Sequence, residues 1–172
     1  MKKLTNKSKV INLGCRLNFF ESEIIENILK KEKDVSKVVI NTCAVTNNAV
    51  QKSIYAVKKA LKDFPNSEVI VTGCASQVEK NRFENLGHIS KIVDNKLKTN
   101  PNSYISEGRV HEQNFNFPSI DYLSTQRTRA MLQIQQGCNH RCTFCIIPYG
   151  RGDAVSLTFT EISKRVKKIL SS

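Results

Sequence analysis

Three cysteines stand close together near the C-terminal end of the chain. Cys138, Cys142 and Cys145 lie in the segment CNHRCTFC, at spacings of four and three positions. Three thiolates can hold three corners of a cubane iron–sulfur cluster, whose fourth iron is then free to bind a small chelating molecule. The alternative is a zinc site with His140 or a distant residue as fourth ligand. Because His140 lies inside the tight loop and would reach such a metal only with difficulty, the spacing favours the cluster.

Three further cysteines each follow a short apolar run. Cys15, Cys43 and Cys74 end the segments INLGC, INTC and VTGC, and each run is typical of a β-strand. Ligands of open parallel sheets bind at the carboxyl ends of the strands, so we expect these residues to converge along one edge. The alternative is that each is a buried small apolar residue, as most free cysteines are. The repeated placement favours shared ligation of zinc or an iron–sulfur cluster.

Strand-like runs alternate with helix-like patterns through the first part of the chain. Runs rich in β-branched residues predict strands at 9–13, 37–42, 68–73 and 91–94. Between the second and third runs, apolar residues recur at steps of three and four, which predicts a helix capped by Thr46 or Asn47 and ended by Pro65. A second apolar face lies at 24–29, and a weaker helix is expected from 76 to about 86. This alternation predicts an α/β fold with an open parallel sheet of βα repeats.

The sequence predicts two structured parts joined by a linker. Residues 1–97 form the N-terminal α/β domain, and the polar stretch 98–128 is the linker. Residues 129–172 predict one βα unit, with a strand at 130–135, the cysteine loop and an amphipathic helix. A (β/α) barrel has its active site at the carboxyl ends of its strands and needs at least about 200 residues. We therefore expect the start of a truncated barrel.

The charge balance favours a polyanionic partner. Lys and Arg total 27 against 15 acidic residues, which gives a net charge of +12. A basic protein of this kind attracts nucleic acid, although a solvated, lysine-rich surface is the simpler alternative. No segment approaches the length of a membrane span, and no signal peptide is evident, so a cytoplasmic location without a membrane partner is expected. In the cytosol, six cysteines indicate metal ligands or catalytic thiols rather than structural disulfides.

The chain resembles the radical S-adenosylmethionine methylthiotransferases in four segments: GCRLNFFESE, NTCAVT, VTGCASQ and QGCNHRCTFCIIPYGRG. The order and spacing of all six cysteines are similar, and Cys-x3-Cys-x-aromatic-Cys is the signature of radical S-adenosylmethionine enzymes. The segments look closest to the N-terminal part of the branch that acts on threonylcarbamoyladenosine in tRNA.

The resemblance implies two 4Fe–4S clusters and S-adenosylmethionine as cofactors. One cluster is implied on Cys15, Cys43 and Cys74, where it is associated with the inserted sulfur. The other is implied on the loop cysteines, where it binds S-adenosylmethionine and cleaves it with one electron to a deoxyadenosyl radical. Phe144 and Gly150 are expected in the S-adenosylmethionine pocket. The resemblance assigns no catalytic residue in this chain beyond the cluster ligands.

The implied function is methylthio insertion at C2 of threonylcarbamoyladenosine next to the tRNA anticodon. The implied partners are the tRNA anticodon loop and an electron donor, and no DNA is expected. Related branches act on isopentenyladenosine or on an aspartate of a ribosomal protein. The alternative from a different class is a basic, zinc-binding RNA-interaction module without catalysis. Arg127, Arg129 and Arg141 are candidates for phosphate contacts, with solvated charge as the alternative.

Overall fold

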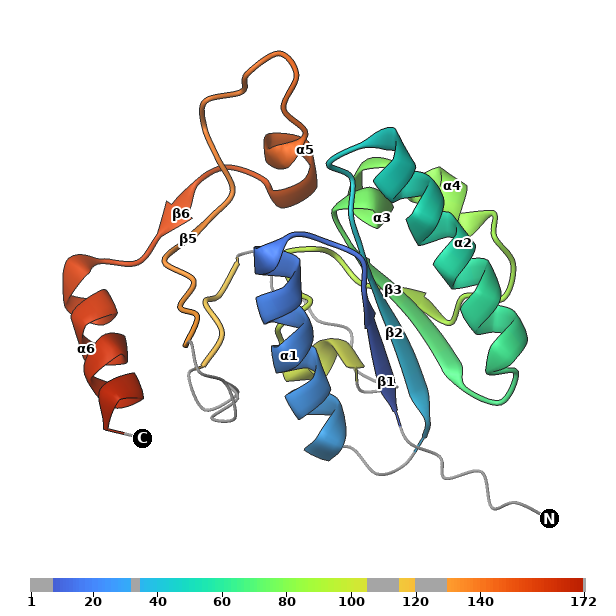
Figure 1. The fold of residues 1–172 in the computed structure, drawn as a ribbon, viewed down its shortest axis with the longest axis horizontal. Helices are drawn as coiled ribbons and strands as arrows, with labels where there is room; N and C mark the ends of the chain where they lie inside the picture. The colour runs from blue at the N-terminus through green and yellow to red at the C-terminus, as the bar shows by residue number, and fades with distance from the viewer. Residues whose placement is uncertain (1–7, 32–34, 105–114, 120–129, 172) are drawn as a thin grey trace.

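A computed structural model describes residues 8–31, 35–104, 115–119 and 130–171. Its larger part is a sheet with helices packed on it, and its C-terminal part holds the cysteine loop and a final helix (Figure 1). Arg127 and Arg129, with most of the predicted linker, lie outside the described residues.

The sheet is four-stranded and entirely parallel, as predicted. Its order follows the chain, β1-β2-β3-β4. All six residues of β2 are buried, as expected for a central strand covered on both faces. The fourth strand is shorter than its apolar run suggested. The strands are β1 Lys9–Asn12, β2 Lys37–Thr42, β3 Glu68–Gly73 and β4 Lys91–Ile92.

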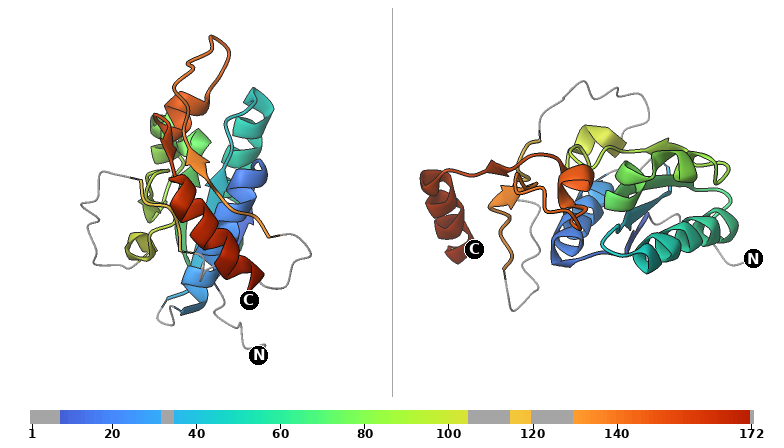
Figure 2. Two further views of the ribbon diagram at one scale, coloured as in Figure 1. Left: turned by 90° about the vertical axis from the view of Figure 1, so that its left-hand side faces the viewer. Right: turned by 90° about the horizontal axis from the view of Figure 1, so that it is seen from above.

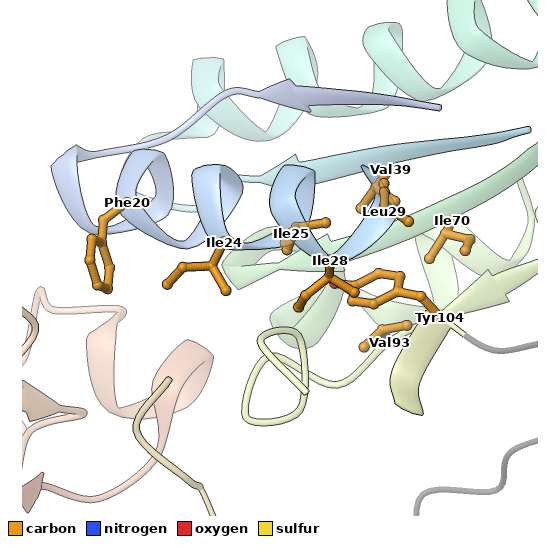
Figure 3. Close-up of a cluster of buried hydrophobic side chains, with 9 residues drawn as sticks. All are labelled: Phe20, Ile24, Ile25, Ile28, Leu29, Val39, Ile70, Val93 and Tyr104. Atoms are coloured by element: carbon orange, nitrogen blue, oxygen red, sulfur yellow. The ribbon is translucent and has the colours of Figure 1, made fainter. Parts of the chain in front are cut away.

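Helix α1, Arg16–Lys31, packs on one face of the sheet. It forms an apolar cluster with Val39 of β2, Ile70 of β3 and Tyr104 (Figure 3). Burying one large aliphatic side chain contributes roughly 1.5–3 kcal/mol, so this face fixes the position of α1 firmly. The apolar residues that α1 buries are Phe20, Ile24, Ile25, Ile28 and Leu29.

The opposite face is covered by three helices: α2 Asn47–Asp63, α3 Cys74–Val78 and α4 Lys80–Glu84. Because side chains alternate along a strand, Val38 and Ile40 of β2 join this second cluster, whereas Val39 joins the first. Thr46 caps α2 as predicted, since its hydroxyl oxygen accepts a hydrogen bond from the Ala49 N–H at 3.1 Å. The weak third crossover helix is divided into α3 and α4.

The elements after β4 are short apart from the last helix. The strand expected at 130–135 is wrong over most of its length, because only β5 forms, and it pairs antiparallel with the two residues of β6. A strand extends only as far as a neighbour offers hydrogen-bonding groups. The C-terminal helix is confirmed as α6, which stands away from the sheet (Figure 2). These elements are η1 Pro101–Tyr104, β5 Gln135–Gln136, α5 Ile147–Arg151, β6 Val155–Ser156 and α6 Phe159–Leu170.

Within the described ranges, no helix combines the length and apolar character that a membrane crossing requires.

Substitution of Gly73 by alanine should destabilise the fold more than the same change at Gly87. Both residues have positive φ, of 101° and 107°, so alanine is strained at either site. At Gly73 the added Cβ would also lie 2.3 Å from the Thr42 carbonyl oxygen, whereas at Gly87 it meets nothing within 4 Å. We expect about 1–3 kcal/mol for Gly87→Ala and a larger loss for Gly73→Ala in denaturant unfolding. Equal losses would show that the contact between β3 and β2 is not tight.

Candidate metal and cofactor site

Cys15, Cys43 and Cys74 lie at the same edge of the sheet, as the sequence predicts. The register pairs Thr42 with Gly73, so the next residues, Cys43 and Cys74, leave neighbouring strands side by side. Asn12 pairs with Asn41 on the other side of β2, which places Cys15 at this edge just before α1. All three thiols therefore stand at carboxyl ends of adjacent parallel strands, where ligands bind in open α/β sheets.

The three edge thiols differ in exposure. Cys43 is 6% exposed, Cys74 is half-buried and Cys15 is exposed. The backbone N–H of Cys43 donates to the Ser53 hydroxyl at 3.2 Å. In the part of the chain that the structure describes, no group of three histidine, cysteine or acidic side chains is arranged as a metal site. The structure thus brings the backbones of the trio to one edge, and ligation by their sulfurs stays a prediction.

The loop cysteines are held by a closed turn. The Cys138 N–H donates to the Gly152 carbonyl at 3.1 Å, and the Cys145 N–H donates to the Cys142 carbonyl at 3.0 Å. Arg141, at φ 47°, pairs with the Asp153 carboxylate at 2.7 Å on the surface. These contacts hold together the two ends of the loop. The phosphate contact of Arg141 stays a prediction.

The predicted pocket residues occupy different environments. Phe144 is 91% exposed, so its contact with a cofactor stays a prediction. Gly150 is buried against Cys74: a Cβ built on Gly150 would lie 3.0 Å from the Cys74 Cβ. The Asn95 side-chain amide donates to both the Cys74 sulfur, at 3.4 Å, and the Gly150 carbonyl, at 2.5 Å. Helix α5, which follows the loop cysteines, therefore packs against α3 (Figure 1). This contact lies at the edge that carries Cys15, Cys43 and Cys74, which we call the edge trio.

A buried ion cluster fastens α5 to the sheet domain. Glu21 of α1 accepts two hydrogen bonds from the Arg151 guanidinium, at 2.8 and 2.9 Å, and pairs with the Lys98 ammonium at 2.5 Å. The side chains are 0%, 5% and 1% exposed in that order. The bidentate pair joins residues 130 positions apart in sequence. It is the principal structural feature that the sequence analysis missed.

Buried amides complete the hydrogen bonds of this ion cluster. The Asn18 side-chain oxygen accepts from Arg151 at 2.5 Å, and the Asn18 amide donates to the Thr42 carbonyl at 2.8 Å. Arg151 also donates to the Gln136 side-chain oxygen of β5 at 2.9 Å. Lys98 donates to the Asn41 side-chain oxygen at 3.3 Å. The network therefore links α1, the carboxyl end of β2 and both sides of the cysteine loop.

Comparison with known proteins places this arrangement in a family. The family described as "Uncharacterized protein family UPF0004" matches residues 7–94, which hold the parallel sheet and the three edge cysteines. The chain belongs to this family.

The UPF0004 chain also resembles proteins named as methylthiotransferases along nearly all of its length. "Threonylcarbamoyladenosine tRNA methylthiotransferase MtaB" of Rickettsia prowazekii (strain Madrid E) is 34% identical over 95% of the chain, and the protein of that name from Bacillus subtilis (strain 168) is 33% identical over 93%. "Ribosomal protein uS12 methylthiotransferase RimO" of Salmonella paratyphi B is 32% identical over 100%. The resemblance noted in the sequence is confirmed. The chain spans 40%, 40% and 42% of the length of these relatives.

Burial and charge oppose each other within the ion cluster of this UPF0004 chain. Burial by itself raises the pKa of Glu21, but the charges of Lys98 and Arg151 outweigh it, and the pKa lies below its ordinary value. Burial lowers the pKa of Lys98, and Arg151 lowers it further. The Glu21 contacts outweigh burial for Arg151 and raise its pKa. Glu21 is therefore ionised at neutral pH, where it pairs with both Lys98 and Arg151.

The residues present fit an iron–sulfur cluster by the chemistry of their donors. Each trio supplies thiol groups alone, and thiolates are the ligands that iron–sulfur clusters take. Two buried cations with one carboxylate lie beside the edge, which suits an anionic thiolate site. Cys15, Cys43 and Cys74 would hold one cluster, and Cys138, Cys142 and Cys145 the other.

Replacing Glu21 by glutamine should remove a pH-dependent part of the stability. The folded-state pKa of Glu21 is lowered, so its contribution is complete above its ordinary value of 4.5 and is lost as the pH falls through the folded-state value. At neutral pH, Glu21→Gln leaves two cations buried together and should cost about 3–5 kcal/mol. The measurement is denaturant unfolding at neutral and acid pH.

The matched control is Glu84→Gln, which removes an exposed ion pair with Lys80. Exposed pairs contribute about 0–1 kcal/mol, so the control should resemble the unaltered chain. If the Glu21→Gln variant loses as much free energy of unfolding in acid as the unaltered chain does, Glu21 is not the source of this pH dependence.

Proposed function

We propose that the chain is the cluster-binding part of a radical S-adenosylmethionine methylthiotransferase. The observation that carries the proposal is the packing of Gly150, which follows the loop cysteines, directly on Cys74 of the edge trio. This contact supports the proposal because it brings the helix that follows the loop cysteines to the sheet edge at Cys74. Relatives named as methylthiotransferases support the reaction class.

We propose that the two sets of cysteines belong to two parts of the chain joined by a linker. Residues 1–97 present the edge trio, 98–128 connect, and 129–172 present the loop trio at the start of a radical S-adenosylmethionine barrel. Cys138, Cys142 and Cys145 would hold the cluster that, when bound, supplies one electron for the cleavage of S-adenosylmethionine. Asn95 and the buried ion cluster keep α5, the helix that follows the loop cysteines, against the edge of the sheet.

The proposed substrate is tRNA, with methylthio insertion at C2 of threonylcarbamoyladenosine beside the anticodon. The net charge of +12 suits a polyanionic partner, and two of the relatives named above act by name on tRNA. The name of the third relative offers ribosomal protein uS12 as the second candidate. The enzyme is proposed to work in the cytoplasm with a separate electron donor.

The iron content of two triple variants tests the proposal. In one variant Cys138, Cys142 and Cys145 become alanine; in the other Cys15, Cys43 and Cys74 do. After anaerobic reconstitution with iron and sulfide, each variant should keep one cluster of about four irons, half the content of the unaltered chain. Iron and zinc are measured by plasma mass spectrometry on the full 172-residue chain.

Full iron content in either triple variant would refute the corresponding ligand set. Stoichiometric zinc without iron in the unaltered chain would contradict the enzyme and support the zinc-binding RNA module.

A further inference from the structure

The buried ion cluster contains more positive than negative charge. Lys98 and Arg151 both pair with Glu21, which is the only carboxylate among the described residues that pairs with either cation. The remaining partners of the two cations in these contacts are neutral amides of Asn18, Asn41 and Gln136. With Glu21 ionised and both cations charged, the group carries one excess positive charge away from water.

The excess charge borders the edge cysteines. Lys98 donates to the side-chain oxygen of Asn41, two residues before Cys43, at 3.3 Å. Arg151 donates to the side-chain oxygen of Asn18 at 2.5 Å, and the amide of Asn18 donates to the carbonyl of Thr42, the residue before Cys43, at 2.8 Å. Gly150, the residue before Arg151, packs on the Cys74 side chain. Lys98 and Arg151 are both buried, so solvent screens their charge much less than it would screen a surface charge.

Lys98 is not needed to hold α5 against α1. The bidentate Arg151–Glu21 pair already joins the two elements and balances its own charge. Adding a second buried cation to a balanced pair is costly unless an anion lies near it. The anions available at this edge are thiolates, and charge near a cluster is one of the factors that set its reduction potential.

We propose that Lys98 and Arg151 are the built-in counter-charge of an anionic thiolate cluster on Cys15, Cys43 and Cys74, with Glu21 positioning both cations and limiting their net charge. The inference rests on the proposed function, since it requires a cluster at the edge. None of the three is a catalytic residue: Lys98 and Arg151 act through their charge, and Glu21 is a positioning residue. Lys98 and Arg151 would favour the reduced, more negative state of a cluster held at this edge, because their positive charge lies close to it.

The test is the midpoint potential of the edge cluster, followed by electron paramagnetic resonance in a redox titration with dithionite. The full chain is used with Cys138, Cys142 and Cys145 replaced by alanine, so that only the edge cluster contributes. Lys98→Met removes a positive charge and should move the potential to more negative values. Glu21→Gln removes the negative charge and should move it to more positive values.

Two kinds of control distinguish an effect of charge on the potential from an effect of structural disruption. Lys98→Arg keeps the charge and should leave the potential nearly unchanged. Lys80→Met and Glu84→Gln make the same changes in an exposed ion pair of α4 and should not shift it. If Glu21→Gln fails to fold, the difference between Lys98→Met and Lys98→Arg still decides the question.

Shifts in the same direction for Lys98→Met and Glu21→Gln, or no shift for Lys98→Met, would overturn the inference. A parent chain that binds no iron after reconstitution would instead refute the proposed function. If the parent chain binds iron but Lys98→Met and Glu21→Gln do not shift the potential in opposite directions, the proposed function stands and the counter-charge is refuted.

Discussion

The bidentate contact between Arg151 and Glu21 is the interaction on which the rest of the arrangement depends. It joins a helix of the sheet domain to the end of the cysteine loop, 130 positions away in sequence. Arg151 directly follows Gly150, which packs on Cys74, and the Asn95 amide donates to both the Cys74 sulfur and the Gly150 carbonyl. A buried ion pair adds little net stability compared with apolar residues of similar size, but its hydrogen-bond geometry selects one arrangement.

The apolar core determines where Glu21 stands. Ile24, Ile25 and Ile28 are buried on the same side of α1 and attach the helix to the sheet, so the Glu21 carboxylate can move little. Asn18, one turn earlier, connects α1 to the carboxyl end of β2 through the Thr42 carbonyl. The same helix thus positions the ion cluster and borders the strand end that carries Cys43. Packing and site geometry are therefore coupled through α1.

Local periodicity accounts for what could be predicted from the sequence. Alternation of strand and helix patterns predicted the parallel sheet and the cap at Thr46, and with them the common edge of Cys15, Cys43 and Cys74. Each of these features depends on residues close together in the chain, or on the rule that parallel strands end at one edge.

The ion cluster could not be predicted in the same way. Arg151 and Lys98 lie in segments without periodicity, and no local pattern pairs residues so far apart. The available signal was Glu21 itself, a charged residue one turn before Ile24 and Ile25 on the face of α1 that packs on the sheet. The strand expected at 130–135 failed for a related reason, because its length depends on the neighbour available to pair with it.

The most direct test of the central claim, that the two thiol trios form one site, is a crystal structure of the reconstituted 172-residue chain with an iron anomalous difference map. Two iron peaks are expected at the carboxyl edge of the sheet, one bound by Cys15, Cys43 and Cys74 and the other by Cys138, Cys142 and Cys145, with the Arg151–Glu21 contact intact. Iron bound at other residues, or two peaks on separate sides of the sheet, would contradict it.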